Sequence, residues 1–281
     1  MSSASIQPFT SRRMGIYNPF QQLETSRLKL AQLEQELEKA RKQGMYVESA
    51  LDAGHVGFSG NVNSGVAAFE MEYAHWVEEQ NRQICELRSA LQAHITEIEL
   101  RMLVESGLNH YHSLFRMKAD AAKADVFYLM SGVWRTSTER FFLWIGGFRP
   151  SELLNIIRPQ LEPMTDQQVL SVCNLRQSSQ QAEDALSQGM EKLQQSLSQS
   201  IGFESVIAGN YGSQMAAAME KLEALEGFVN QADHLRQQTL QHMSRILTTH
   251  QTARGLLALG EYFHRLRALS SLWAARPREP A

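Results

Sequence analysis

The sequence predicts an all-α protein with a short leucine-zipper helix, a flexible Gly-rich linker, and a bundle of long, mostly antiparallel helices. Two observations support this fold class. Leu23, Leu30 and Leu37 are spaced seven residues apart in a charged context, which is typical of a coiled-coil seam. From Val66 onward, apolar residues recur every three or four positions without strand-like alternation. The second region is therefore predicted to be an all-α bundle.

The domain organisation follows from composition along the chain. Residues 1–20 are polar and contain two prolines, so we expect a disordered N-terminal tip. Residues 21–43 form the predicted zipper helix, and Gly44 ends it. Residues 44–65 hold repeated glycines and are predicted to be a flexible linker. Residues 66–281 then form the helical domain.

The zipper is short and carries polar seam positions. With Leu23, Leu30 and Leu37 at heptad position d, Arg27 and Glu34 fall at position a. Polar residues at position a weaken a coiled coil while restricting its partners, so we expect a marginal, selective dimer. The alternative is a single solvated helix with charge pairs four residues apart.

Further helices are expected within residues 66–281. An apolar stripe predicts one helix of about ten turns from Val66 to Met102. Another helix is expected at Leu108–Met117. Ala119–Ile145 is apolar on more than one side, which predicts a central, buried helix. Pro150 suits the first turn of a short helix.

The second half of the domain reads as three long helices. Thr165 and Gln168 form a capping-box pattern, and the helix that they open runs to about Ser200. Apolar residues from Met215 to Met243 mark the next helix. The last helix covers roughly Gln251 to Trp273.

Composition excludes several classes of protein. Hydrophobic residues make up 43% of the 281 residues and charged residues 20%, and the net charge of −3 gives no general attraction to phosphate. The N-terminus lacks the apolar core of a secretory signal, and the apolar cluster Phe141–Phe148 is too short to span a bilayer. Two cysteines, Cys85 and Cys173, are typical of a protein in a reducing compartment, the cytosol or the nucleus.

Several segments resemble a known family. AFEMEYAHWVEEQNRQICELR, FYLMSGVWRTSTERFFLWIGGFRPSELL and VCNLRQSSQQAEDALSQGMEKLQ resemble the C-terminal delay-of-germination-type domain of plant TGA bZIP factors, and the zipper and SRRMGIYNPF also resemble that family. The resemblance implies a dimerising transcription regulator of defence and developmental genes, in the nucleus and also the cytoplasm, at TGACG-containing DNA elements. It also implies docking of BTB–ankyrin co-activators and, in some branches, CC-type glutaredoxins.

The sequence departs from the family in front of the zipper. A bZIP basic region places an Asn and several basic residues on one helical face to reach bases and phosphates. Here the residues before Leu23 read SRRMGIYNPFQQ, in which Arg12 and Arg13 are the basic residues and Pro19 disfavours a helix. We expect weak or no DNA binding by this chain alone, and DNA contact through a dimer partner. The alternative is a full DNA-binding activator represented by a short isoform or an incomplete gene model.

The cysteines and histidines offer few candidate sites. Both Cys85 and Cys173 lie among apolar neighbours, so burial is the default expectation. Cys173 is a candidate redox residue, but Ser179 stands where some members of the family that the chain resembles carry a second cysteine. The histidines have no metal-site spacing, and no catalytic motif occurs. We therefore expect no enzyme, no cofactor and no metal.

An aromatic cluster leaves a third function open. Phe127, Trp134, Phe141, Phe142 and Trp144 could line an apolar pocket, which would make the domain a ligand-binding helical sensor module. The simpler interpretation is that these side chains pack in the core.

Overall fold

The computed structural model describes residues 59–202 and 211–277, and all of its regular structure there is helical. The predicted disordered tip, the zipper at 21–43 and the linker up to residue 58 lie outside the described residues. The all-α prediction is confirmed. The helices are, in chain order, α2 (Ser59–Ala93), α3 (Glu97–Ser131), α4 (Ser137–Phe141), α5 (Pro150–Ile157), a 3₁₀ turn η1 (Arg158–Gln160), α6 (Asp166–Gly202), α7 (Tyr211–Ile246) and α8 (Thr249–Ala274).

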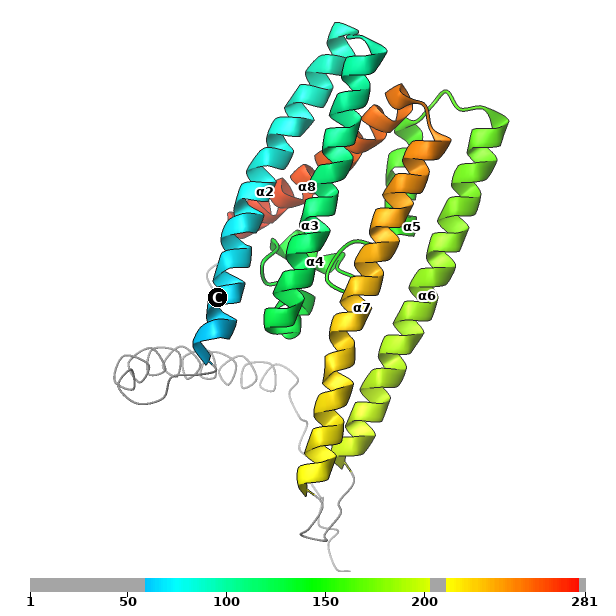
Figure 1. Cartoon of the computed structure of the whole chain (residues 1–281). Helices are drawn as coiled ribbons and strands as arrows, with labels where there is room; N and C mark the ends of the chain where they lie inside the picture. The colour runs from blue at the N-terminus through cyan, green and yellow to red at the C-terminus, as the bar shows by residue number, and fades with distance from the viewer. Residues whose placement is uncertain (1–58, 203–210, 278–281) are drawn as a thin grey trace, which may run out of the picture. The chain divides into compact units, whose positions relative to one another are not determined.

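Four long helices stand side by side and alternate in direction, in the order α2, α3, α7, α6 (Figure 1). Helix α8 crosses obliquely behind α2 and α3 and packs against both. The short helix α5 lies between α8 and the α6–α7 pair, and α4 packs against α8. The prediction of long, mostly antiparallel helices is thus confirmed, with α8 as the crossing element.

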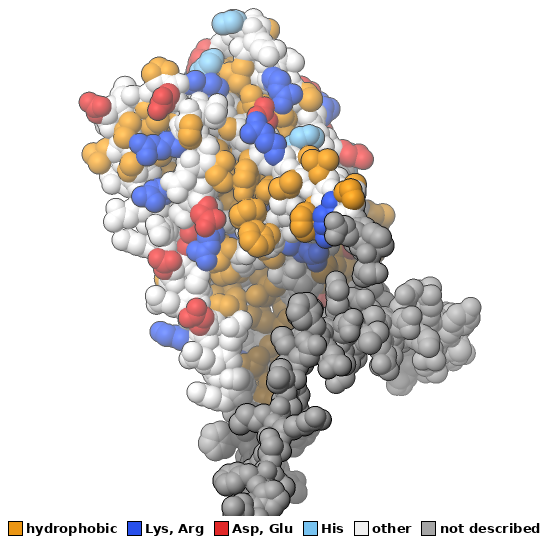
Figure 2. All heavy atoms as spheres, turned by 180° about the vertical axis from the view of Figure 1, so that it is seen from behind, with side chains coloured by type: hydrophobic (Ala, Val, Ile, Leu, Met, Phe, Trp, Pro, Cys, Tyr) orange, Lys and Arg blue, Asp and Glu red, His pale blue; other side chains and the backbone are white. Residues whose placement is uncertain are grey.

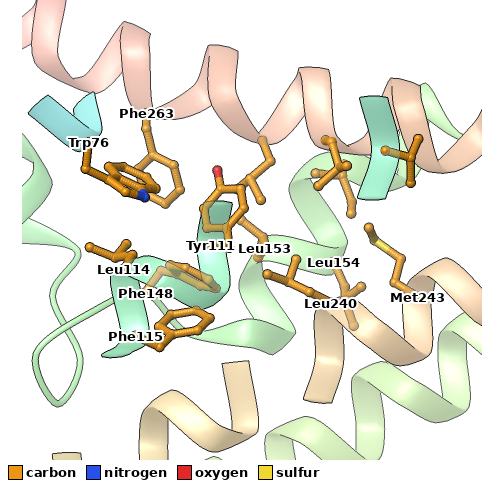
Figure 3. Packing of buried hydrophobic residues seen from close by; sticks show 14 of the residues in the cluster. Trp76, Tyr111, Leu114, Phe115, Phe148, Leu153, Leu154, Leu240, Met243 and Phe263 are labelled. Carbon is orange, nitrogen blue, oxygen red and sulfur yellow. The ribbon is translucent and has the colours of Figure 1, made fainter. Parts of the chain in front are cut away.

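The core sits where α8 crosses the long helices. Side chains from α2, α3, α5, α7 and α8 interdigitate there, among them Trp76, Tyr111, Leu154, Met243 and Phe263 (Figure 3). Burying one such large apolar side chain contributes about 1.5–3 kcal/mol. The core therefore fixes α8 across the bundle and, through α5, the segment that precedes it.

The first helix starts earlier than the sequence suggested. We expected a linker up to residue 65, but α2 begins at Ser59. At Gly65 an added Cβ would lie 2.7 Å from the Cβ of Ala124 on α3. This glycine therefore allows close helix packing, whereas the sequence pattern indicated a linker residue.

The expected single helix from Val66 to Met102 is wrong, because the chain reverses at His94, whose φ is +53°. Thr96 and Glu99 form a capping box that begins α3: the Glu99 backbone N–H donates to Thr96 Oγ1 at 3.3 Å, and Glu99 Oε2 accepts from the Thr96 backbone at 3.0 Å. Beyond this turn Met102 is 65% exposed. The apolar period alone did not reveal the break.

The predicted central helix at Ala119–Ile145 is also wrong. Helix α3 continues through residue 119, kinks at Asp125 and ends at Ser131, with Gly132 as its C-cap. The region beyond it holds only the five-residue α4 and a turn. Leu129 is fully buried, but Phe127 and Phe141 are 56% and 83% exposed. The two helices predicted within residues 108–145 are therefore one helix and a separate segment.

The later boundaries agree closely with the sequence. Thr165 and Gln168 exchange side-chain and backbone hydrogen bonds of 3.1 and 3.2 Å, which confirms the predicted capping box of α6. Helix α5 begins at Pro150, as predicted. Among residues 59–202 and 211–277, no helix is both long and apolar enough to cross a membrane.

Candidate functional site at the segment between α3 and α5

Residues 132–149 join α3 to α5 and include α4; we call them the connecting segment. The segment has little regular structure, with only α4 and an antiparallel bridge between Trp144 and Gly147. Ile145 has φ of +39°, a conformation that β-branched residues rarely adopt. Such a segment needs tertiary contacts to hold one conformation, and charged side chains from three neighbouring helices supply them.

Arg236 of α7 holds the turn at residues 144–148. Its guanidinium donates to the backbone carbonyls of Trp144 at 2.5 Å, Ile145 at 3.1 Å and Phe148 at 2.7 Å. The side chain is fully buried, and burial lowers the pKa of the guanidinium although Asp233 opposes the shift. The bonds to Ile145 and Phe148 satisfy buried carbonyls, and the bond to Trp144 adds to the one that this carbonyl accepts from the Gly147 backbone N–H. Arg236 therefore acts as a buried clamp on the connecting segment.

Gly147 is the residue that makes room for this clamp. A Cβ at position 147 would lie 2.6 Å from Arg236 Cζ and 2.8 Å from Nε. The guanidinium also lies over the rings of Trp144 and Phe148, at 5.2 and 5.6 Å. Arginine and glycine are thus matched across the interface between α7 and the connecting segment.

Lys118 of α3 joins the same network. Its Nζ lies 2.5 Å from Asp233 Oδ1, and Arg236 Nη1 lies 2.6 Å from the same oxygen. Burial lowers the pKa of Lys118 to about 7, with Asp233 as the main opposing influence. Two cations thus share one buried carboxylate, whose Oδ2 has no hydrogen-bond partner among the described residues.

A second buried carboxylate anchors the start of α5. Glu183 of α6 is fully buried and accepts from the Ser151 backbone N–H and from Ser151 Oγ, both at 2.7 Å. These bonds satisfy donors at the N-terminus of α5, where negative charge is also favoured by the helix dipole. Arg149 Nη1 lies 3.7 Å from Glu183 Oε2, so the buried carboxylate also has a cationic partner.

A third group fixes α4 against α8. Glu139 Oε2 accepts from Thr136 at the start of α4, while Oε1 lies 3.4 Å from Arg267 and 3.9 Å from Arg135. The Thr138 backbone N–H donates to Ser270 Oγ at 2.9 Å. Buried donors on Arg135 and Arg267 have no partner among the described residues. Glu139 therefore neutralises two arginines and ties α4 to α8.

The connecting segment lines a small pocket together with α5 and α8. Phe142, Phe148, Ile156, Tyr262 and Leu266 form its apolar wall. The pocket encloses about 20 Å³, room for a single water molecule. The five aromatic residues singled out from the sequence do not surround one cavity, since only Phe142 of that set lines this pocket.

Those aromatic residues have separate environments. Trp134 packs edge-on against Phe69 and Tyr73, with centroids 5.2 and 4.6 Å apart. Trp144 is buried beneath Arg236. Phe141 and Phe142 are 83% and 46% exposed. The expectation of a packed core therefore holds for the two tryptophans and is wrong for these phenylalanines.

The structure places the predicted site residues as follows. Leu23, Leu30 and Leu37 lie outside the described residues. Cys173 is half-buried on α6 and is a free thiol. Ser179 is buried, and its hydroxyl lies 3.2 Å from that of Thr239 on α7. Redox activity of Cys173 therefore stays a prediction.

Two other sequence expectations meet the structure here. Cys85 is exposed, which corrects the expectation of a buried thiol. Among the described residues, no group of three or more His, Cys, Asp or Glu side chains could hold a metal ion. His110 is buried against Trp76, with ring centroids 4.5 Å apart, and burial lowers its pKa.

Sequence reasoning missed the buried charges. The available signal was their position: Lys118 follows Leu114 by one helical turn on an apolar stripe, and Arg236 follows Ala232 in the same way. A charge on an apolar stripe is unusual and indicates a buried partner. The pattern does not say which residue that partner is.

Comparison with known proteins covers most of this chain. Residues 83–159 match the family described as DOG1, seed dormancy control. The chain is 72% identical over 261 residues to transcription factor TGA3 of Arabidopsis thaliana, covering 92% of this chain and 68% of that protein. It is 67% identical over 260 residues to transcription factor TGA1 of Arabidopsis thaliana, covering 92% and 71%. It is 65% identical over 261 residues to the TGACG-sequence-specific DNA-binding protein TGA-1A of Nicotiana tabacum, covering 92% and 73%.

Proposed function

Because this chain belongs to the plant TGA family of bZIP transcription factors, we propose that it regulates transcription through protein contacts, with weak or no DNA binding of its own. It is a transcription regulator and not an enzyme, and its function lies in the nucleus. The observation that carries the proposal is the stretch from Ser11 to Gln22, whose only basic residues are Arg12 and Arg13. We infer that its target genes are defence and developmental genes with TGACG elements.

The DNA-binding part of the proposal follows from charge. Each phosphate contact contributes a counterion-release term, so useful affinity at physiological salt requires many basic residues on one face. An electrophoretic shift with labelled TGACG DNA tests this, with the Nicotiana tabacum relative as positive control. We expect no shifted complex at nanomolar concentration of this chain. A nanomolar complex at moderate salt would overturn the proposal.

Pairing is proposed to use Leu23, Leu30 and Leu37. The substitution Leu30→Pro should abolish self-association, because proline breaks the zipper helix. Leu30→Ala should weaken the dimer, whereas Leu28→Ala, which lies away from the seam, should leave it intact. Sedimentation equilibrium of the full chain gives the mass. An unchanged dimer mass for Leu30→Pro would move the interface to the helical domain.

Mixed pairing would have a regulatory consequence. A dimer of this chain with a full-length TGA relative holds one basic arm instead of two, so it loses half of the base and phosphate contacts. We propose that this chain dampens DNA binding by its relatives. Titrating it into a full-length relative on TGACG DNA should reduce the shifted complex, and the Leu30→Pro variant should not. No reduction by the unmodified chain would refute dampening.

The helical domain is proposed to dock BTB–ankyrin co-activators and, in addition, CC-type glutaredoxins. The anchored connecting segment supports this idea, because it presents exposed side chains on a fixed backbone. Calorimetric titration of the purified full chain with a purified BTB–ankyrin co-activator tests it. Docking by the helical domain predicts equal affinity for the Leu30→Pro variant, and no measurable heat would contradict it.

A further inference from the structure

The C-terminal half of α8 carries an exposed apolar stripe that continues an internal one. Tyr262 and Leu266 face the pocket under the connecting segment. Leu269 and Trp273 follow them at helical spacing, so they continue the same face of α8 beyond α4 and α5. Leu269, Leu272 and Trp273 are 52%, 70% and 59% exposed. One face of α8 therefore passes from buried to exposed without losing its apolar character.

The connecting segment adds aromatic side chains beside this stripe. Phe142 lines the pocket with Leu266, and Phe141 packs edge-on against Phe142 with centroids 5.1 Å apart. Helix α4 is fixed to α8 by the Thr138–Ser270 hydrogen bond. We call Phe141, Phe142, Leu269, Leu272 and Trp273 the α4–α8 face. Exposed large apolar side chains on two elements that are bonded to each other in this way are typical of a site that binds another protein.

The charges around the α4–α8 face are of both signs: Glu152 is exposed at the pocket that Phe142 lines, and two arginines flank the face. Arg140 precedes the phenylalanine pair, and Arg276 lies with its guanidinium carbon 3.6 Å from the Trp273 ring centroid. Among the described residues, no carboxylate lies within ion-pair distance of either arginine. Arg265 is 76% exposed and pairs with Glu261. Glu139, the carboxylate of α4, is buried and already satisfied.

Figure 2 shows the molecule from behind, the side on which α8 crosses the bundle. Hydrophobic side chains gather over the middle of that side, with Lys, Arg, Asp and Glu side chains between and beside them. A partner that covers such a surface must supply apolar anchors and, at its edges, negative charge. Regular helical spacing along α8 favours an occupant with the same spacing, which is an amphipathic helix.

We propose that the α4–α8 face docks an acidic amphipathic segment of a partner protein, with bulky apolar residues on one side and Asp or Glu on the other. Leu269, Leu272 and Trp273 contact the apolar side, and Arg140 and Arg276 pair with the carboxylates. Phe141 and Phe142 form the second wall of the site. The proposal goes beyond the proposed function, because it assigns a surface and a partner chemistry that hold whichever co-activator is involved.

The experiment uses a fluorescein-labelled synthetic peptide and the full chain. The peptide carries Leu and Trp at helical positions i, i+3, i+4 and i+7, with Glu and Asp at the other positions. A control peptide has Lys in place of every acidic residue. Fluorescence anisotropy at two salt concentrations gives the affinity. We expect the acidic peptide to bind at least tenfold more tightly, with affinity falling as salt rises. Equal affinity for the two peptides would overturn the proposal.

Variants locate the binding site. The double variant Leu272→Ala, Trp273→Ala should bind the acidic peptide at least tenfold more weakly. The double variant Arg140→Glu, Arg276→Glu should show the same loss of affinity. Matched controls at the far end of the α2–α3 pair, Ile98→Ala with Met102→Ala, remove equally exposed apolar groups and should have no effect. All of these side chains are exposed, so thermal unfolding should be unchanged. If the control variant lost as much affinity for the peptide as the α4–α8 variants, the assignment of the binding site would be refuted.

Two other occupants are separated by the same measurements. Displacement of the peptide by duplex DNA, abolished by Arg140→Glu with Arg276→Glu, would replace the proposal with a nucleic-acid site. Loss of a dimer in the Leu272→Ala, Trp273→Ala variant would replace it with a contact between two copies. Co-activator binding that survives these variants, together with lost peptide binding, would support this proposal and the docking of co-activators elsewhere on the domain.

Discussion

The ammonium group of Lys118 on α3 and the carboxylate of Asp233 on α7 form a buried ion pair with an Nζ–Oδ1 distance of 2.5 Å. Asp233 also holds Arg236, which clamps the connecting segment through three backbone carbonyls. The pair thus links the packing of the two central helices to the conformation of the connecting segment.

Removing the carboxylate should cost far more than removing the lysine. Asp233→Asn leaves two buried cations without their anion, and the expected loss in unfolding free energy is about 3–5 kcal/mol. Lys118→Met keeps the volume and leaves the Asp233–Arg236 pair intact, so it should cost less than half as much. Urea unfolding monitored by circular dichroism compares them. Equal losses would contradict this prediction, because they would show that Lys118 contributes as much as the shared carboxylate.

Stability should depend on pH through Lys118. Its pKa is about 7 in the folded protein and near 10.5 when the side chain is free in water. Between these values the unfolded chain binds a proton that the folded chain does not, so raising the pH favours folding. The stability of the natural chain minus that of Lys118→Met should therefore rise from pH 7 to pH 9.5. A difference that is flat over this range would exclude the lowered pKa.

Gly147→Ala should weaken the clamp, because the new Cβ would lie 2.6 Å from Arg236 Cζ. Overpacking of this kind costs about 1–3 kcal/mol. Gly227→Ala on α7 is the matched control, since a Cβ there meets nothing within 4 Å and alanine favours a helix by up to about 1 kcal/mol. Thermal unfolding should shift down for the first variant and up for the second. A higher unfolding temperature for Gly147→Ala would show that the turn accommodates a Cβ at this position without displacing Arg236.

The two free thiols should differ in reactivity. Cys85 is exposed and Cys173 is half-buried, so a thiol reagent reaches Cys85 first. Mass spectrometry after brief treatment of the folded chain with iodoacetamide should find the label mainly at Cys85. Denatured protein, in which both thiols are accessible, gives the reference ratio. Faster labelling of Cys173 would show an activated thiol and would strengthen the redox prediction for that residue.

Local sequence signals predicted the helices well and their interruptions poorly. The capping box at Thr165 was predicted and confirmed, because such a box involves residues only three positions apart. The equivalent box at Thr96 was missed, since the apolar spacing continues through Ile98 and Met102. Those two side chains are exposed, so periodicity alone placed them on a buried stripe that had already ended.

The connecting segment could not be predicted from sequence for a different reason. Its apolar composition is typical of a buried helix, but of its large apolar side chains Trp144 and Phe148 are buried while Phe141 is exposed. Arg236, which is about 90 residues away along the chain, bonds the backbone of Trp144 and Phe148 and so fixes which of these side chains are buried. A pattern read over one or two helical turns does not contain that contact.

The sequence by itself determined that the protein is all-α and that it resembles the TGA family. Both can be recognised from residues close together in the chain, through apolar spacing over a few helical turns and through continuous matching segments. It also supplied the zipper prediction at Leu23, Leu30 and Leu37, which awaits the association experiments. Tertiary structure alone decided which charges meet. The Lys118–Asp233 pair joins residues 115 positions apart. Packing removes water from both groups, and a buried charge without water is costly unless it has a partner.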